Sequence, residues 1–398
     1  MTLEENVLNL HRILNGKIEI QNRIPIGNTS EEQKGKEALS LIYTPGVAFA
    51  AKKISDDINL AYSYTSKWNN VAIVCDGSRI LGLGNIGPYG AIPVMEGKSV
   101  LFKALSGVNG YPLCIDTKDK EEIIRFVKTI QPVFGAVNIE DIESPKVLEI
   151  VEKLQNDLEI PVFHDDQHGT AVITLAALLN ALKFLDKKID KVKVVIAGAG
   201  SAGYGIFKIL YNANFKNVIV IDSHGALTKD RTEGMMNTNR YKEEIANKTN
   251  AKKISGNFAD MLEESDVFIG VSGKAGLLNE EIVKSMNKDS IIFALSNPDP
   301  EIVPSDALKA GAKIVATGRS DYPNQVNNAL VFPYFLRGLL DARAKRINED
   351  MLIAVAHAIA GLISDNELKE DYIIPRVNDL RLISTITRAV KDACRKNT

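Results

Sequence analysis

The sequence has few cysteines, little net charge and no apolar run long enough to cross a membrane. Cys75, Cys114 and Cys394 are too few and too scattered for a disulfide framework or a cysteine metal cluster, so a reducing cytoplasm fits best. A formal net charge of -2 gives no electrostatic reason to expect nucleic acid or an anionic membrane as partner. The apolar run at 171–182 is interrupted by Asn180 and is far shorter than a bilayer span. The first residues also lack the pattern of a secretory signal.

What the sequence does contain is the composition of an ordinary globular protein, with 45% hydrophobic and 25% charged residues. A chain of 398 residues exceeds what one hydrophobic core usually supports, so two domains are expected. From about residue 191 onward, short apolar strands alternate with helical segments, which predicts a doubly wound parallel sheet of the Rossmann type. The expected strands are at 191–198, 218–222, 265–273, 290–298 and 312–318.

The first part of the chain alternates in the same way, but with longer loops. Strands are expected within 71–84, 133–141 and 160–169, and helices at 121–132 and 145–158. The last segment is mostly helical and should pack back onto the body. The fold class is therefore α/β, and the predicted division is an N-terminal substrate and metal domain, a dinucleotide-binding domain and a C-terminal helical segment, at residues 1–168, 169–335 and 336–398.

A glycine-rich turn follows the first strand of the predicted Rossmann sheet. Gly198, Gly200 and Gly203 form G-x-G-x-x-G, and Ser201 and Ala202 open the next helix. The first glycine permits a tight turn, the second lets backbone approach a pyrophosphate, and the third allows close packing of helix on strand. Such turns also occur for structural reasons alone, but here the strand and helix flank the motif as dinucleotide binding requires.

Asp222 ends the following strand, about 20 residues on. Its carboxylate would accept hydrogen bonds from the adenine ribose and repel a 2′-phosphate, which favours NAD over NADP. Ser223 and His224 follow, and a hydroxyl or a protonated imidazole would tolerate a phosphate. NADP therefore stays open as a coenzyme.

Two strands each end in a pair of carboxylates, Glu140 with Asp141 and Asp165 with Asp166. Four acids at neighbouring strand ends would repel one another unless a cation lay among them. Oxygen ligands suit Mg²⁺ or Mn²⁺ rather than zinc. Either pair alone is as readily explained by solvated loop acids, and the nearby His164 and His168 are interpreted as structural or as supporting the ligands.

At this point the sequence resembles the malic enzymes, particularly the short bacterial type. The resemblance covers about residues 40 to 335 and rests on several motifs in a shared order. They are YTPGVA (43–48), DGSRILGLGNIG (76–87), GK (97–98), NIED (138–141), FHDDQHGTA (163–171), GAGSAG (198–203), LSNP (295–298) and NNALVFP (327–333).

The resemblance implies a role for individual residues. Tyr43 matches the general acid that protonates the enol carbon, and Lys98 matches the general base that takes the malate hydroxyl proton. Arg79 matches the arginine that grips a substrate carboxylate. The remaining matches are the metal ligands Glu140, Asp141 and Asp166, the neighbouring acid Asp165 that tunes the site, and the asparagines Asn297, Asn327 and Asn328 that touch substrate or nicotinamide.

The implied reaction is the oxidation and decarboxylation of malate to pyruvate and CO₂, and these residue types suit it. A base removes the hydroxyl proton, and Lys98 serves only with a lowered pKa, which burial and a nearby cation favour. A divalent cation stabilises the enolate left by CO₂ loss. The resemblance further implies a homodimer, in which the Tyr43 segment completes its own or a partner's active site.

Four other functions compete with this interpretation. An oxidative decarboxylase of tartrate, isocitrate or a related β-hydroxy acid would share the metal and coenzyme, and a metal-dependent oxaloacetate decarboxylase would keep the nucleotide as a non-reacting cofactor. A non-enzymatic NAD-binding protein would lack the base or the acids. An amino-acid dehydrogenase has no need of two acidic strand ends.

Overall fold

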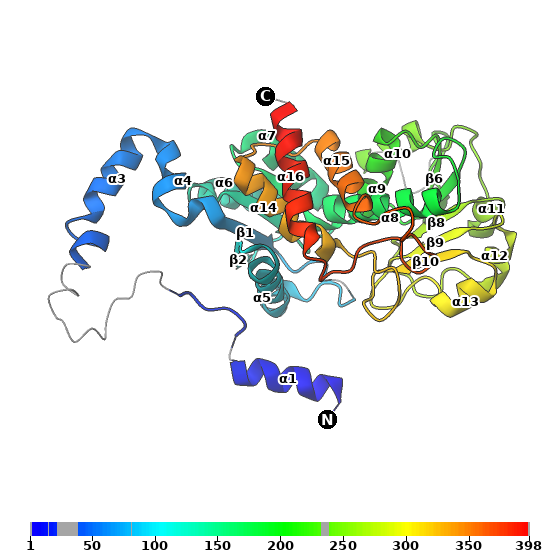
Figure 1. Ribbon diagram of the computed structural model, residues 1–398, viewed down its shortest axis with the longest axis horizontal. Coiled ribbons are helices and arrows are strands. Elements are labelled where there is room, and N and C mark those ends of the chain that lie inside the picture. The colour runs from blue at the N-terminus through cyan, green and yellow to red at the C-terminus, as the bar shows by residue number, and fades with distance from the viewer. Residues whose placement is uncertain (1, 15, 22–38, 81, 232–238, 397–398) are drawn as a thin grey trace.

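The computed structural model describes residues 2–14, 16–21, 39–80, 82–231 and 239–396. Two parallel sheets lie side by side, with helices around them (Figure 1). Among the described residues, no helix is both long and apolar enough to cross a membrane. The predicted α/β class with a Rossmann-type sheet is confirmed.

The first sheet has four parallel strands in the order β2-β1-β3-β4. Central β1 is buried along its whole length, as expected for an apolar strand in a parallel sheet. Helix α5 packs against β2 and α14, and α6 packs against α7. The bounds are β1 Asn70–Cys75, β2 Asn109–Cys114, β3 Ala136–Glu140, β4 Val162–His164, α5 Gly87–Ser106, α6 Lys120–Ile130 and α7 Lys146–Asp157.

The second sheet has the order β10-β9-β8-β5-β6-β7, parallel except for the short β7. The strand order reverses beside β5, which is where doubly wound sheets bind ligands. Alternate residues of these strands, such as Val194 and Val195, enter two different cores, so the sheet is buried on both faces. The bounds are β5 Lys193–Ala197, β6 Asn217–Asp222, β7 Gly225–Ala226, β8 Val267–Gly270, β9 Ile291–Ala294 and β10 Ile314–Thr317.

The helices around this sheet follow from the intervening sequence. Several begin at an asparagine whose side chain accepts from the first turn, as Asn257 and Asn279 do. The bounds are α9 Ser201–Asn212, α10 Arg240–Lys248, α11 Phe258–Leu262, α12 Glu280–Ser285 and α13 Pro304–Lys309.

Helix α8 (Thr170–Phe184) connects the two sheets. It is apolar around most of its circumference and almost wholly buried, as such a helix must be. It packs against α9 and follows the π-helical turn η4 (Asp165–Gly169), which continues from β4. One core therefore runs from the first sheet into the second.

The C-terminal helices pack back onto the body, as predicted. They are α14 (Phe332–Ala342), α15 (Glu349–Ala360) and α16 (Arg381–Lys396). Phe332 and Phe335 of α14 meet Phe102 and Phe163 of the first domain at centroid distances of 5.0 and 5.3 Å. Helix α15 packs on α8, where the Asn180 amide donates to backbone carbonyls of Ala360 and Ile373, both at 3.0 Å.

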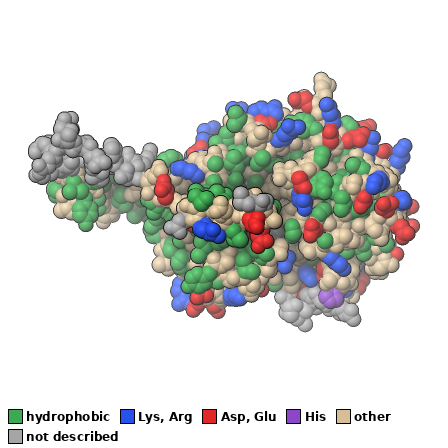
Figure 2. Space-filling model, turned by 90° about the horizontal axis from the view of Figure 1, so that it is seen from below, with side chains coloured by type: hydrophobic (Ala, Val, Ile, Leu, Met, Phe, Trp, Pro, Cys, Tyr) green, Lys and Arg blue, Asp and Glu red, His purple; other side chains and the backbone are tan. Residues whose placement is uncertain are grey.

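The N-terminal helices lie apart from these layers. Helix α3 (Val47–Asp56) lies on an arm that leads through α4 (Ala61–Tyr64) to β1, and α1 (Leu3–Leu14) lies beyond α5 (Figure 1). Neither α1 nor α3 buries a residue. Figure 2 shows hydrophobic side chains on the projecting part, whereas acidic and basic side chains are interspersed over the body.

Candidate active site

The glycine turn between β5 and α9 has the geometry expected of a dinucleotide site. Gly198 has a φ of +116°, and a Cβ on Gly203 would lie 1.8 Å from the Gly198 carbonyl oxygen. Both glycines are therefore needed by the fold. Of the described residues, none would lie within 4 Å of a Cβ on Gly200, and none caps the first turn of α9 with its side chain. Open space at Gly200, at the N-terminus of α9, suits an approaching phosphate.

The carboxylate of Asp222 lies at the end of β6 but is already engaged by cations. Arg231 donates to both oxygens, at 2.9 and 2.7 Å, and Lys242 Nζ donates to Oδ2 at 2.7 Å. The backbone N–H of His224 adds a bond of 2.8 Å to Oδ1. Although burial raises its pKa, these partners hold the pKa of Asp222 at about 2. Sequence reasoning foresaw the carboxylate but not the two cations, which come from later segments.

The strand ends of the first sheet bring a lysine and the carboxylates together. Lys98 of α5 reaches over the sheet, where its Nζ donates to Oε1 of Glu140 and, at 2.6 Å, to Oδ2 of Asp165. All three side chains are nearly or fully buried. Glu140 ends β3, and Asp165 begins the π-helical turn after β4, a kind of turn that often occurs at functional sites.

Mutual repulsion and burial raise the pKa values of two acids in this cluster. Burial, and then the charges of Glu140 and Asp166, raise the pKa of Asp141 to about 8. Burial likewise raises the pKa of Asp165 to about 7, against the opposing effect of Lys98. Four carboxyl groups thus lie near a single positively charged lysine. Part of their negative charge is removed by protonation and is not balanced by a cation.

The pKa of Lys98 differs from the sequence-based expectation. Burial lowers it, as foreseen, but the ion pairs with Asp165 and Glu140 outweigh burial and hold the pKa above its ordinary value. Lys98 is here the counter-ion of the two carboxylates. A divalent cation bound to the acids would take over that role and lower the pKa of the lysine.

The residues fit a divalent cation chemically. Within the part of the chain that the structure describes, Oδ1 of Asp165 is buried without a hydrogen-bond partner, the donor set is all oxygen, and the acids carry surplus charge. Across the described residues, no three His, Cys, Asp or Glu side chains are grouped as they would be around a metal ion. Both oxygens of Glu140 have partners, because Lys98 donates to one and Asn138 Nδ2 donates to the other at 2.7 Å.

The two histidines beside the acids, His164 and His168, are buried. The His164 backbone N–H donates to Nδ1 of His168 at 3.1 Å. Burial lowers the pKa of both, to about 3 for His168, so both stay neutral. This agrees with their interpretation as supporting residues.

The loop after β1 places Arg79 in a cleft beside the Lys98 cluster. Asp76 anchors this loop, because its side chain accepts from the Ser78 hydroxyl at 2.6 Å and from Lys146 at 2.8 Å. The exposed Arg79 lines a cleft of about 470 Å³ together with Asp166. Gly200, Ser201 and Ala202 line the same cleft from the cofactor side, and Asn297, Asn327 and Asn328 complete it.

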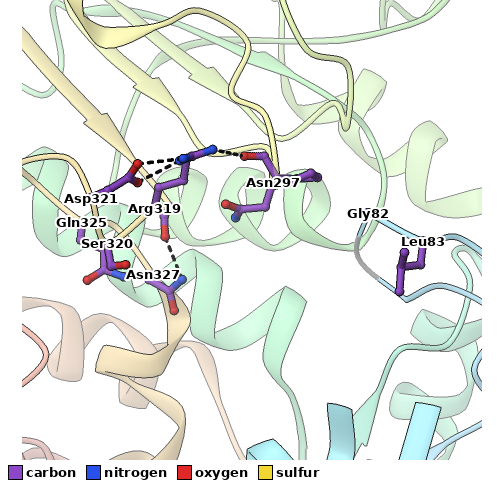
Figure 3. A pocket seen from close by; sticks show the side chains of 10 residues that line it. Gly82, Leu83, Asn297, Arg319, Ser320, Asp321, Gln325 and Asn327 are labelled. Carbon is purple, nitrogen blue, oxygen red and sulfur yellow. Dashed lines mark hydrogen bonds and ion pairs between the residues drawn. The ribbon is translucent and has the colours of Figure 1, made fainter. Parts of the chain in front are cut away.

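A second hollow of about 700 Å³ adjoins the cleft and shares Asn297 and Asn327 with it (Figure 3). Asn327 donates to the Gly318 carbonyl at 3.0 Å, which fixes its amide. Arg319 forms a two-pronged ion pair with Asp321 and donates to the Pro298 carbonyl at 2.9 Å. Of the asparagines predicted to touch substrate or nicotinamide, Asn297 and Asn327 therefore lie where the two spaces meet, whereas Asn328 lines the cleft alone.

Of the three predicted catalytic residues, Lys98 and Asp165 lie in the cluster and Tyr43 does not. Its side chain is 68% exposed, and it precedes α3 on the arm. It lines neither the cleft nor the hollow beside it.

Sequence reasoning also missed residues that hold the site together. Asn138 precedes Glu140 by two positions on β3, and the two-residue period of a strand would have placed both on one face. The Asp76–Lys146 pair had no sequence signal, because its partners are 70 residues apart.

Comparison with known proteins gives one consistent result. The profile "Malic enzyme, N-terminal domain" matches residues 21–155, and "Malic enzyme, NAD binding domain" matches residues 167–394. A "Bifunctional malic/malolactic enzyme" of Bacillus subtilis is 49% identical, over 99% of this chain and 93% of that protein. An "NAD-dependent malic enzyme" of Geobacillus stearothermophilus is 50% identical, over 96% and 77%. The crystal structure of an NAD-dependent malic enzyme from Thermotoga maritima superposes with a TM-score of 0.91 at 46% identity, covering 96% and 98% of the two chains. This chain therefore belongs to the malic enzyme family.

Proposed function

We propose that this chain oxidises and decarboxylates L-malate to pyruvate and CO₂, with reduction of a nicotinamide coenzyme and with help from a divalent cation. One observation carries the proposal. A single cleft is lined on one side by the glycine turn and on the other by Arg79 and Asp166, beside the buried Lys98 cluster. A small hydroxy acid in this cleft lies within reach of both a hydride acceptor and a base.

We assign each side chain around the cleft a separate role. Lys98 takes the proton of the malate hydroxyl, and Asp165, 2.6 Å from its Nζ, holds and tunes the amine. Arg79 holds a substrate carboxylate by its fork of N–H donors. Asn297 and Asn328 position the substrate, and Asn297 and Asn327 the nicotinamide.

The remaining roles belong to the cation and to the acid. Glu140, Asp141 and Asp166 would hold Mg²⁺ or Mn²⁺, which supplies stabilisation of the negative charge that develops on oxygen. Tyr43 donates a proton to the enol carbon after CO₂ has left.

The activity is tested by mixing the protein with L-malate, Mn²⁺ and NAD or NADP, with and without chelator, and following reduced nicotinamide by its near-ultraviolet absorbance. We expect a chelator-sensitive rise with stoichiometric pyruvate. Lactate in place of pyruvate would indicate the malolactic reaction named for the Bacillus subtilis relative. Release of CO₂ from oxaloacetate without coenzyme reduction from malate would indicate the decarboxylase alternative.

The glycine turn predicts opposite outcomes for two similar substitutions. Gly200→Ala should leave the thermal unfolding temperature unchanged, because its Cβ meets nothing, but should weaken NADH binding by about tenfold or more, because the methyl group obstructs the pyrophosphate. Gly203→Ala should lower the unfolding free energy by about 1–3 kcal/mol, because its Cβ would overlap the Gly198 carbonyl. Fluorescence titration with NADH and thermal unfolding measure the two effects. Unaltered NADH affinity in Gly200→Ala would remove the turn from the coenzyme site.

We propose NAD as the preferred coenzyme, with measurable use of NADP. Asp222 disfavours a 2′-phosphate, but Arg231 and Lys242 already offset its charge. Asp222→Ala should raise the ratio of kcat/KM for NADP to that for NAD by about tenfold, since two cations then lack their carboxylate. Asp230→Ala is the matched control, because the exposed Asp230 pairs with Lys253 nearby. Equal ratios in both variants would contradict the assignment of Asp222.

We further propose a homodimer in which Tyr43 enters the active site of the partner subunit. Helices α1 and α3 bury none of their residues, and they expose large apolar side chains. Among these, Leu3, Ile13 and Phe49 are 71–81% exposed. Such surface is covered in most soluble proteins. A second copy is the occupant that would also supply each site with its acid. Light scattering that gave a monomer mass for fully active protein would contradict this arrangement.

A further inference from the structure

Two cysteines lie side by side next to the active site, although 39 positions separate them in the sequence. Cys75 ends β1, Cys114 ends β2, and the two are direct partners in the parallel ladder. Directly paired residues point to the same face, and their Cα atoms lie about 4.8 Å apart, within the range that a disulfide spans. The two side chains are therefore neighbours across the β1–β2 ladder.

This pair belongs to the row of side chains under α5 that contains Glu140. Glu140 pairs with Cys75 on the other side of β1, so Cys114, Cys75 and Glu140 follow one another across three strands. A Cβ on Gly110, four residues before Cys114 on the same face, would lie 3.1 Å from Phe102 of α5. Cys75 of this pair is thus the direct neighbour of Glu140, the residue that accepts a hydrogen bond from Lys98.

The two thiols differ in a way that suits oxidation. Cys75 is buried, whereas Cys114 is partly exposed at the edge of the sheet. The hydrogen bond from Cys75 lowers the pKa of Cys114, although burial and Glu96 oppose the shift. A partly exposed thiol with a lowered pKa beside a second thiol is the arrangement of redox-sensitive cysteine pairs.

The sulfur of Cys75 also supports the substrate loop. It accepts the backbone N–H of Gly77 at 3.2 Å. Gly77 is tightly placed, because its φ is +67° and a Cβ there would lie 2.2 Å from the Gly87 carbonyl oxygen. Its own carbonyl accepts from the N–H groups of Ile86 and Gly87 at 3.2 and 3.1 Å. This loop carries Arg79, so the Cys75 sulfur contacts the segment that places the arginine in the cleft.

We propose that Cys75 and Cys114 form a reversible intrachain disulfide that weakens malate binding. The Cys114 thiolate attacks a hydroperoxide and becomes a sulfenic acid, with release of hydroxide or alkoxide. The Cys75 thiol then attacks that sulfur, the new S–S bond forms, and water leaves. The bridged sulfur turns toward Cys114 and gives up the Gly77 N–H, which loosens the loop that holds Arg79.

The experiment uses reduced full-length protein, freed of metal by chelation, treated with hydrogen peroxide and then with catalase. We expect the intact mass to fall by two hydrogen atoms and digestion to yield a cross-linked peptide that contains Cys75 and Cys114. After Mn²⁺ is restored, the KM for malate should be raised about three- to tenfold with a smaller change in kcat, as expected for one lost hydrogen bond. Dithiothreitol should reverse both changes.

Cys114→Ser should neither cross-link nor change its KM after peroxide, whereas Cys394→Ser, the matched control at a partly buried cysteine elsewhere, should behave as the unaltered protein does. Absence of the cross-link, irreversible oxidation of Cys114, or equal sensitivity of Cys114→Ser would overturn the proposal. A bridge that leaves the KM unchanged would overturn it too. The KM readout rests on the proposed malate activity, but the mass and peptide readouts do not, so the two failures can be told apart.

Discussion

Lys98→Ala is expected to reduce malate oxidation on the order of a thousandfold while NADH still binds, because the base for the hydroxyl proton is lost. The substitution also leaves Glu140 and Asp165 buried without their cation, which typically costs about 3–5 kcal/mol of stability. Steady-state kinetics, NADH titration and thermal unfolding must therefore be measured together. The glycine turn is formed by β5 and α9, so NADH affinity should remain.

The matched control is Lys103→Ala, on the same helix. Lys103 is exposed and donates to Asn109 Oδ1, away from the carboxylates. It should keep nearly full activity. If folded Lys98→Ala turned malate over at more than about a tenth of the normal rate, Lys98 could not be the base.

Mixed dimers of two inactive variants are expected to recover activity. Tyr43→Phe lacks the acid and Lys98→Ala lacks the base, so each should be inactive alone. If Tyr43 acts in the partner's site, a mixed dimer contains one site with both residues intact. Random assortment from equal amounts should then give about a quarter of normal activity in the whole mixture and about half in the purified mixed dimers. Co-expression with two different affinity tags and pyruvate assay of the doubly tagged species, where about half of normal activity is expected, measures this.

No activity would return if Tyr43 served its own chain, because each site of the mixed dimer would then lack either the acid or the base. A mixture of Lys98→Ala with a second Lys98→Ala chain is the negative control for contamination. Recovery of activity would also show that the Tyr43 segment, which leads into α3, reaches the partner subunit.

The second sheet could be predicted from the sequence because its signals are local. The strands β5, β6, β8, β9 and β10 are short apolar runs, and the glycines of the turn take the conformations that their spacing implied, whereas the two-residue β7 had no such signal. The first domain was harder. Strand β2 was missed because Gly110 and Pro112 interrupt it, and a proline is tolerated there because β2 is an edge strand. Helix α5 was missed because it contains Pro93 and several glycines.

The site was foreseen as a set of residues but not as a set of contacts. Motifs identified Lys98, Glu140 and Asp165 separately, yet nothing local indicates that the lysine neutralises both acids and gains a raised pKa. The same holds for Asp222, whose cations arrive from 9 and 20 residues downstream. Charge balance in a cleft depends on long-range neighbours, which a sequence pattern does not describe.

The packing between η4 and α9 depends on a single glycine. A Cβ on Gly205 of α9 would lie 2.2 Å from the Gln167 carbonyl oxygen, so the helix that receives the dinucleotide rests directly on the turn that holds Asp165 and Asp166. Any side chain at this position would have to push the helix and the turn apart. The absence of one methyl group therefore sets how closely the coenzyme helix approaches the acids in the folded chain.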